Sequence, residues 1–175
     1  MPILVTITGP IAAGKNTVAD LLALRCVQTG RTVVVSDLDD VAFAVAPADK
    51  RGGLWLAAHR AQGALVGEWM RSQIDVVIAI GPIFNKDEQE ALYGQLPIDA
   101  SPCRVLIDAP LATTWQRVTA EPSRGASREQ GFHQRAHARY RSLMPNIPAD
   151  LTFDSSTTSA AEIADTIARV VGITD

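Results

Sequence analysis

Short apolar runs alternate with longer segments of helical periodicity along the whole chain. The runs are continuous and rich in β-branched residues, which is typical of parallel strands that are buried on both faces. The longer segments repeat their apolar residues every three or four positions, as helices with one buried face do. Strands are therefore expected at Ile3–Thr8, Thr32–Ser36, Val76–Ile80, Arg104–Ile107 and Leu151–Phe153.

The segments between these strands predict the helices. Alternation of strand and helix indicates an α/β fold in which helices cover both faces of a parallel sheet, giving three layers. No composition change marks a boundary, so we expect a single domain, 1–175. Ligands of such folds bind beyond the carboxyl ends of the strands. The expected helices are Val18–Cys26, Leu54–Met70, Lys86–Tyr93, Leu111–Thr119, Phe132–Leu143 and Ala160–Val171.

Composition narrows the class of protein. The 175 residues are 47% hydrophobic and 20% charged, an ordinary globular balance. The net charge of −3 argues against a nucleic-acid partner. No apolar run reaches membrane-spanning length and no signal peptide is visible, so no membrane partner is expected. Cys26 and Cys103 have no metal-binding spacing and fit two free thiols in a reducing compartment, which predicts a cytoplasmic protein.

One stretch carries recognisable chemistry, between the first strand and the first helix. Its spacing is that of the P-loop, G-x-x-x-x-G-K-[ST], with an asparagine where serine or threonine is usual. The bounding glycines let backbone N–H groups turn inward, and the helix start adds positive potential. The stretch predicts a nucleotide-phosphate site formed by Gly9, Pro10, Ile11, Ala12, Ala13, Gly14, Lys15, Asn16 and Thr17.

The loop and the order of elements together resemble the nucleoside-monophosphate-kinase-like group of P-loop kinases. That group includes adenylate, shikimate and gluconate kinases and antibiotic phosphotransferases. The resemblance covers nearly the whole chain as an order of elements, but only the P-loop is a specific motif. It implies a five-stranded parallel sheet in the order 2-3-1-4-5, ATP and Mg²⁺ as cofactors, and an arginine-bearing lid at about 121–135.

Asn16 is compatible with activity, because adenylate kinases carry Gly-Lys-Gly-Thr at the corresponding positions. The resemblance implies that Mg²⁺ is held through waters or by the Asn16 amide oxygen, near Asp37. It places Thr17 on the α-phosphate and Lys15 on the β- and γ-phosphates. A degenerate, inactive loop is the alternative.

Acidic residues follow the second strand, where several relatives orient or deprotonate the attacking hydroxyl. Asp37 is closest to the strand end and is the candidate base. Asp39 is a candidate for substrate or water-held metal, and also for a helix N-cap. The alternative is that Asp37, Asp39 and Asp40 are all capping and turn residues.

Four further residues are expected to bind the acceptor. Arg60 lies on the helix that resembles the substrate-binding helix of the group, and Trp55 precedes it by one turn. Gly81 and Pro82 follow the third strand, where shikimate kinases have an acceptor loop. The alternatives are an exposed helix face for Arg60, a core position for Trp55 and a simple tight turn for Gly81 and Pro82.

The lid region supplies the candidate charge-neutralising groups. Arg124 and Arg128 are expected to act on the transferring phosphoryl group, because guanidinium groups stabilise its charge. By family position, Arg117, Ser155 and Ser156 are expected to contact the nucleotide. The remaining basic and imidazole side chains of the next helix are expected on a solvated surface: Arg135, Arg139, Arg141, His133 and His137.

These observations favour an ATP-dependent phosphotransferase that moves the γ-phosphoryl group to a hydroxyl of a small-molecule acceptor. One alternative is a nucleoside monophosphate kinase, in which Arg60 would hold the acceptor phosphate and no base is needed. The other is a nucleotide-binding regulator without catalysis. Neither the acceptor nor the oligomeric state can be deduced from the sequence.

Overall fold

The computed structural model describes residues 1–41 and 54–173. All five predicted strands form, each within a residue or two of its expected limits. They make one parallel sheet in the order β2-β3-β1-β4-β5, so the order 2-3-1-4-5 is confirmed. The strands are β1 (Ile3–Thr8), β2 (Val33–Asp37), β3 (Val76–Ile80), β4 (Cys103–Asp108) and β5 (Leu151–Asp154).

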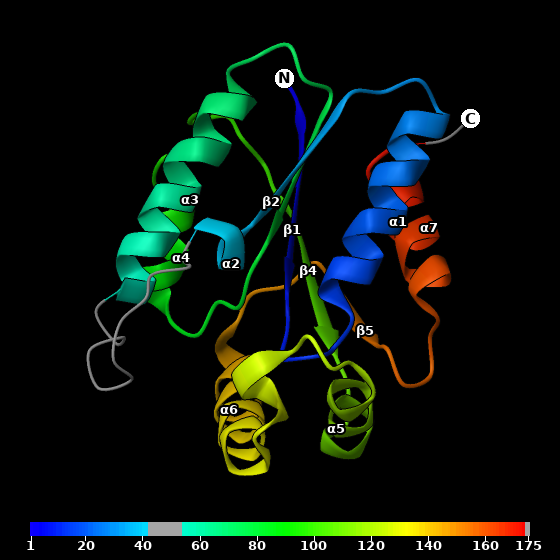
Figure 1. Cartoon of the computed structure of the whole chain (residues 1–175). Helices are drawn as coiled ribbons and strands as arrows, with labels where there is room; N and C mark the ends of the chain where they lie inside the picture. The colour runs from blue at the N-terminus through cyan, green and yellow to red at the C-terminus, as the bar shows by residue number, and fades with distance from the viewer. Residues whose placement is uncertain (42–53, 174–175) are drawn as a thin grey trace.

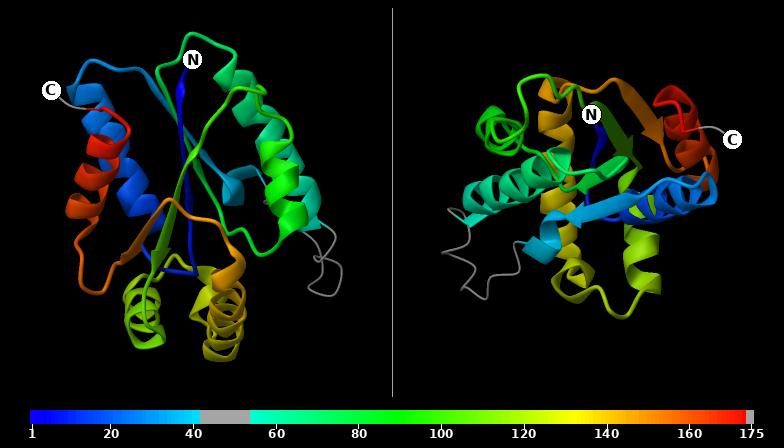
Figure 2. Two further views of the ribbon diagram at one scale, coloured as in Figure 1. Left: turned by 180° about the vertical axis from the view of Figure 1, so that it is seen from behind. Right: turned by 90° about the horizontal axis from the view of Figure 1, so that it is seen from above.

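Helices cover both faces of the sheet, which confirms the three-layer α/β fold. Helices α1 and α7 pack together on one face and α3 and α4 on the other, while α5 and α6 lie beyond the carboxyl ends of the strands (Figure 1). Figure 2 shows the same layers from behind and from above. The helices are α1 (Lys15–Gln28), α2 (Leu38–Val41), α3 (Leu54–Met70), α4 (Lys86–Tyr93), α5 (Leu111–Ala120), α6 (Gln130–Leu143) and α7 (Ala160–Val170).

Two apolar clusters hold these layers together. The larger lies between the sheet and the α1–α7 pair and includes Leu22 and Ile167, both fully buried. The smaller lies between the sheet and α3, around Val66 and Val77. Burial of both faces of the central strands β1 and β3, and of the middle of β4, explains why these strands are apolar runs in the sequence. Within the described residues, no helix is long and apolar enough to cross a membrane.

The acidic segment after β2 is the short helix α2 rather than a loop. Leu38 is fully buried and fills the space that a side chain at Gly81 would need, since a Cβ there would lie 2.7 Å from the Leu38 Cβ. The Asp37 carboxylate accepts a 2.9 Å hydrogen bond from the Asp39 backbone N–H. Packing of Leu38 and this side-chain bond therefore start the helical turn directly at the strand end.

Helix α6 buries two histidine side chains that were predicted to be solvated. The prediction that His133 and His137 lie at the surface is wrong, because both are almost completely buried. His133 Nε2 lies 2.9 Å from Thr114 Oγ1 on α5, and His137 Nε2 lies 2.9 Å from the carbonyl oxygen of Ala109. The two histidines face α5 and the end of β4, so tertiary packing buried a helix face that the sequence made polar.

Candidate active site

The P-loop connects β1 to α1 and passes very close to β4. A Cβ on Gly9 would lie 2.0 Å from the Ile107 carbonyl oxygen, so only glycine fits there. Gly14 has a φ of 97°, a left-handed conformation that L side chains avoid. From Gly14 the chain enters α1 directly, with the Val18 N–H bonded to the Gly14 carbonyl at 3.0 Å. The two glycines thus produce the loop and helix start that suit a phosphate group.

Lys15 lies at the centre of this loop. Its Nζ donates to the carbonyl oxygens of Gly9 and Pro10, at 3.0 and 2.9 Å. Burial lowers the pKa of Lys15 to about 8, while the nearby negative charges of Asp39 and Asp37 oppose that shift. The positive charge of Arg124 lowers the pKa of Lys15 further. The Lys15 ammonium group therefore lies near charged side chains from the end of β2 and from the lid region.

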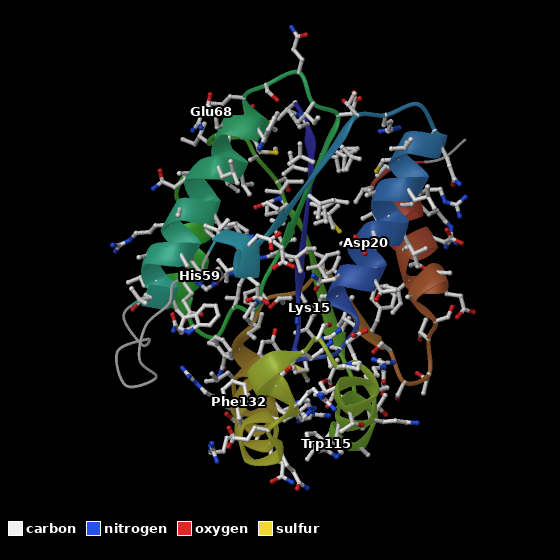
Figure 3. All side chains as sticks on the ribbon, in the orientation of Figure 1. Lys15, Asp20, His59, Glu68, Trp115 and Phe132 are labelled. Atoms are coloured by element: carbon white, nitrogen blue, oxygen red, sulfur yellow. The ribbon has the colours of Figure 1, made fainter. Side chains whose placement is uncertain are left out.

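A cleft of about 610 Å³ opens beside the P-loop at the carboxyl ends of the strands. Figure 3 shows Lys15 at the start of α1, with Phe132 on α6 below it and His59 on α3 to one side. The cleft therefore lies where parallel α/β sheets bind ligands. Of the predicted site residues, those that line it are Gly9, Pro10, Ile11, Ala12, Gly14, Lys15, Asn16, Thr17, Asp37, Asp39, Trp55, Gly81, Pro82 and Arg124.

Two acidic residues of the cleft, Asp37 and Asp39, are linked to the P-loop. Asn16 donates from its side-chain amide to Asp37 Oδ2, and the second oxygen of Asp37 accepts the backbone N–H of Asp39. Partial removal of water raises the pKa of Asp39, the Asp37 charge raises it further, and Lys15 opposes both. Asp37 is thus held by two donors, whereas Asp39 is a carboxyl group whose pKa is raised.

These residues fit a magnesium ion that is shared with a nucleotide. Carboxylate oxygens of Asp37 and Asp39, the Asn16 amide and the Thr17 hydroxyl are hard ligands of the kind Mg²⁺ prefers. Among residues 1–41 and 54–173, no group of three or more His, Cys, Asp or Glu side chains is arranged to hold a metal. A site with one or two carboxylates is what Mg²⁺ uses when phosphates and waters complete its shell.

Arg117 and Ser155 lie behind the P-loop rather than in the cleft. Arg117 Nη1 donates to the Ala12 carbonyl at 3.2 Å and to Ser155 Oγ at 2.9 Å, and Nη2 donates to the Ser155 carbonyl at 2.7 Å. Ser155 Oγ in turn donates to the Ala13 carbonyl at 2.7 Å. These bonds join α5, the segment after β5 and the loop, so both residues brace the backbone of the P-loop.

Ser156 is exposed and bonds to Asp154 rather than to the P-loop. Its backbone N–H and hydroxyl both donate to Asp154 Oδ1, and these bonds lower the pKa of the Asp154 carboxyl. Ala13, within the P-loop, is fully buried and does not line the cleft. Contact of Ser156 or Arg117 with a nucleotide remains a prediction.

Arg60 and Arg128 are exposed and lie outside the lining of the cleft. Arg60 lies outside because of helix geometry. Its neighbours His59 and Gln62 occupy the inward face of α3. His59 contacts the carbonyl oxygens of Trp55 and Pro82, and Gln62 donates to those of Ser36 and Ile80. Arg60 is rotated about 100° from His59 and points elsewhere. Arg128 ends the 3₁₀ turn η2 (Gly125–Arg128).

One wall of the cleft was not predicted from the sequence. The face of α6 that was expected to be solvated borders the cleft, and Arg135 and Arg139 line it, whereas Arg141 pairs with Asp108 at 3.2 Å. The lining positions of α6 recur three or four residues apart, as one face of any helix does, so this spacing alone does not show which face borders the cleft. The cleft-lining residues that sequence reasoning missed are Phe84, Glu88, Ser127, Phe132, Arg135, Ala136, Arg139 and Tyr140.

Comparisons with known proteins identify the fold. No family model matches the chain, and no curated protein matches its sequence. Among solved structures, a sugar kinase from a Janibacter species is similar with a TM-score of 0.66 and 14% identity, over 99% of this chain and 96% of that one. Shikimate kinase from Acinetobacter baumannii, solved with shikimate, has a TM-score of 0.56 and 20% identity over 98% and 93%. YorR from Bacillus subtilis, solved with phosphorylated GDP, has a TM-score of 0.61 and 15% identity over 97% and 96%.

These similarities extend over nearly the full length of each chain, but the identities are low. They therefore show that the chain has a P-loop kinase-like fold, and they do not assign an activity or a substrate.

Proposed function

We propose that this protein is an ATP-dependent kinase that transfers the γ-phosphoryl group to a hydroxyl of a small-molecule acceptor. One observation carries the proposal: Asp37 and Asp39 line the same cleft as the P-loop, close enough to Lys15 to influence its pKa. Phosphoryl transfer depends mainly on positioning and charge neutralisation, with one group that orients the nucleophile. The cleft contains candidates for both tasks: Lys15 for charge neutralisation and the two carboxylates for orienting the nucleophile.

The chain's own residues have distinct roles in this proposal. Lys15 and Arg124 neutralise charge on the phosphates, and Arg128 joins them when the lid segment closes. Asp37, fixed by Asn16, orients the acceptor hydroxyl, and Asp39 takes its proton because its pKa is raised. Asn16 and Asp37 would hold Mg²⁺, which when bound with ATP supplies further neutralisation of the β- and γ-phosphates.

The acceptor side also has support. Trp55, Gly81 and Pro82 line the same cleft as the P-loop and could contact an acceptor there. A nucleoside monophosphate kinase needs no base, and Arg60, the residue expected to hold its acceptor phosphate, lies outside the lining. The acidic pair in the cleft therefore favours a hydroxyl acceptor.

The test begins with a thermal-shift screen of metabolites, with a non-hydrolysable ATP analogue and Mg²⁺ present, because specific binders stabilise the folded state. The acceptor found is then used in a coupled ADP assay. Asp37→Asn is expected to abolish transfer while nucleotide binding is retained. Turnover of the variant at the wild-type rate would remove Asp37 from the mechanism, and absence of transfer to any bound alcohol would contradict a kinase.

A further inference from the structure

The imidazole ring of His59 lies between two backbone carbonyl groups. His59 is on α3 and is only 1% exposed. Its Nδ1 lies 2.7 Å from the Trp55 carbonyl oxygen, and its Nε2 lies 2.9 Å from the Pro82 carbonyl oxygen. A carbonyl oxygen only accepts hydrogen bonds, and a neutral imidazole has a single N–H. Both contacts are therefore hydrogen bonds only when the ring carries two protons.

The other two histidines of the chain are arranged differently. His137 contacts one carbonyl oxygen, that of Ala109, through Nε2. His133 Nε2 contacts the Thr114 hydroxyl, which donates its own proton to a backbone carbonyl of α5 and therefore accepts from the ring. A single proton on Nε2 makes the contact of each ring a hydrogen bond. Burial also lowers the pKa of His133, which favours its neutral form.

The contact with Pro82 concerns the wall of the cleft. Proline has no N–H, so the carbonyl oxygen is the only polar group by which the backbone of Pro82 can be held. On either side of it the Gly81 N–H donates to a carbonyl of β1 at 3.2 Å, and the Ile83 N–H donates to a threonine hydroxyl of β1 at 3.0 Å. Pro82 and Trp55 both line the cleft. His59 thus joins two residues that we expect to contact an acceptor.

Charged groups lie around α3, but among the described residues none bonds to the His59 ring. Its neighbour Arg60 is exposed, and a small cavity beside the ring, of about 10 Å³, is lined by uncharged residues. A buried charge without a carboxylate partner is costly. Loss of one proton, and with it one of the two bonds, is therefore the alternative state of this ring. The elements packed against α3 are β2, β3, α2 and α4, and their titratable groups toward the cleft or the sheet are Asp37, Asp39, Glu88 and Tyr93, with Asp40 exposed.

We propose that His59 is a positioning residue, which with a proton on both ring nitrogens ties the first turn of α3 to Pro82 and so sets the acceptor side of the cleft. When the ring loses a proton, one bond is lost and the wall formed by Trp55 and Pro82 loosens. Acceptor binding therefore weakens as the pH rises through the titration of His59. The effect on the acceptor rests on the proposed kinase function, whereas the state of the ring does not.

The state of the ring is tested without any ligand, by nitrogen-15 NMR of the three imidazoles. At about pH 6, His59 is expected to carry a proton on both nitrogens, whereas His133 carries one on Nε2 alone. The two nitrogens of each ring have different shifts when only one is protonated, so the spectrum distinguishes the states. A single proton on His59 at this pH overturns the inference.

The link from the ring to the loop is tested by exchange of the Ile83 backbone N–H with solvent deuterium. After correction for its intrinsic pH dependence, this exchange should become about tenfold faster as His59 loses its proton, about the effect of one bond to a charged group. The Val76 N–H, which donates to the Thr32 carbonyl at the other end of β3, should show no such step. Exchange at Ile83 that does not follow the titration of His59 contradicts the link.

Two variants separate this effect from other titrations. His59→Gln supplies amide donors that do not titrate between about pH 5 and 8, so the step in Ile83 exchange should be absent. Glu68→Gln is the control, because it removes an exposed titratable group from the opposite end of α3 (Figure 3) and should keep the step. Unfolding temperatures verify that both variants are folded.

The kinetic probe is the alcohol that gives the largest thermal shift in the metabolite screen, with ATP and Mg²⁺ saturating. The ratio of the wild-type KM to that of His59→Gln should rise about tenfold as His59 loses its proton, while the ratio of kcat values stays within about twofold. A KM ratio that is constant with pH overturns the role of His59 in positioning the acceptor. A doubly protonated ring with coupled Ile83 exchange, but without transfer to any alcohol, would contradict the kinase activity alone.

Discussion

Asn16 occupies the position where most P-loops carry a serine or threonine hydroxyl. In this protein its amide donates to Asp37 at the end of β2, so the unusual residue links the donor loop to the acidic residues of the cleft. A serine side chain is too short to make the same bond. We therefore interpret Asn16 as part of the arrangement of Asp37, and not as a sign of a degenerate loop.

Lys15 leads to a prediction about proton uptake. Its pKa is lowered to about 8, and phosphate charges would raise the pKa again on binding. The protein should therefore take up protons when a nucleotide binds at about pH 8 to 9, and affinity should fall as the pH rises through that range. Calorimetry of a non-hydrolysable ATP analogue in buffers of different ionisation enthalpy measures this uptake.

Lys15→Arg is the control for this prediction, because a guanidinium group does not titrate in this range. The variant should bind without proton uptake. Affinity that is constant from about pH 7 to 9 in the wild type would show that Lys15 keeps its ordinary pKa.

Asp39 gives a second prediction at this scale. Partial removal of water, the Asp37 charge and the Asp40 charge raise its pKa, and Lys15 lowers it. Asp37→Asn should lower the pKa of Asp39 more than Asp40→Asn does, whereas Lys15→Met should raise it. Titration of the Asp39 carboxyl carbon by NMR measures all three shifts, and a shift of opposite sign in any variant would contradict the arrangement.

At the scale of elements, α6 is the structure that completes the site. Its C-terminal half is anchored by Tyr140 to Thr8, by His137 to the Ala109 carbonyl and by Arg141 to Asp108. The segment 121–135, predicted as a lid, includes the first residues of this helix from Gln130 onward. Movement on closure is therefore expected in the residues before α6, which include Arg124 and Arg128, while the anchored helix keeps Arg139 in place.

The Tyr140 anchor can be tested against a matched tyrosine. Tyr140 OH lies 2.8 Å from Thr8 Oγ1, which also accepts the Ile83 N–H at 3.0 Å, and Tyr93 OH lies 3.0 Å from Thr6 Oγ1 on the same strand. Tyr140→Phe and Tyr93→Phe should each lower the free energy of unfolding by about 1 kcal/mol.

Only Tyr140→Phe should also raise the KM for the acceptor, because Tyr140 lines the cleft and Tyr93 does not. Denaturant unfolding and steady-state kinetics measure the two effects. Equal effects of the two variants on KM would show that α6 is positioned by other contacts.

Helices α3 and α4 pack closely through a glycine on α3, which gives a stability prediction. A Cβ on Gly63 would lie 2.5 Å from the Leu92 carbonyl oxygen and 2.7 Å from that of Ala91. Gly63→Ala should therefore destabilise the protein by about 1–3 kcal/mol, as overpacking does. Ala64→Ser, at the exposed neighbouring position, should change the unfolding free energy by less than about 0.5 kcal/mol in a denaturant titration.

At the scale of the whole molecule, the cleft gathers the P-loop, the ends of β2 and β3, the start of α3, the residues before α6 and α6 itself. A ligand that bridges these segments should stabilise the entire fold. A non-hydrolysable ATP analogue with Mg²⁺ at a hundred times its Kd should add about 2.7 kcal/mol to the unfolding free energy.

Lys15→Met should remove most of this stabilisation, and removal of Mg²⁺ by chelation should reduce it. Thermal unfolding monitored at several ligand concentrations measures the effect. A wild-type unfolding temperature that does not respond to the analogue would contradict a nucleotide site at the P-loop.

The sequence by itself determined the strands, their parallel order through the resemblance, and the P-loop with Lys15. Continuous β-branched runs and a motif of fixed spacing depend only on residues that are close together in the sequence, so they can be recognised without the tertiary structure. The same is true of the acidic residues after β2, because they follow the strand directly and therefore lie at the edge of the sheet where its carboxyl ends meet.

Only the tertiary structure decided which faces of the helices point into the cleft. Arg60 was predicted to line it and lies outside, whereas Arg135 and Arg139 line it and their helix buries His133 and His137 on another face. A helix turns about 100° per residue, so its rotation against the sheet decides which side chains a ligand meets. That rotation is fixed by packing between residues far apart in the chain, such as Tyr140 with Thr8 and His59 with Pro82, and no local pattern records it.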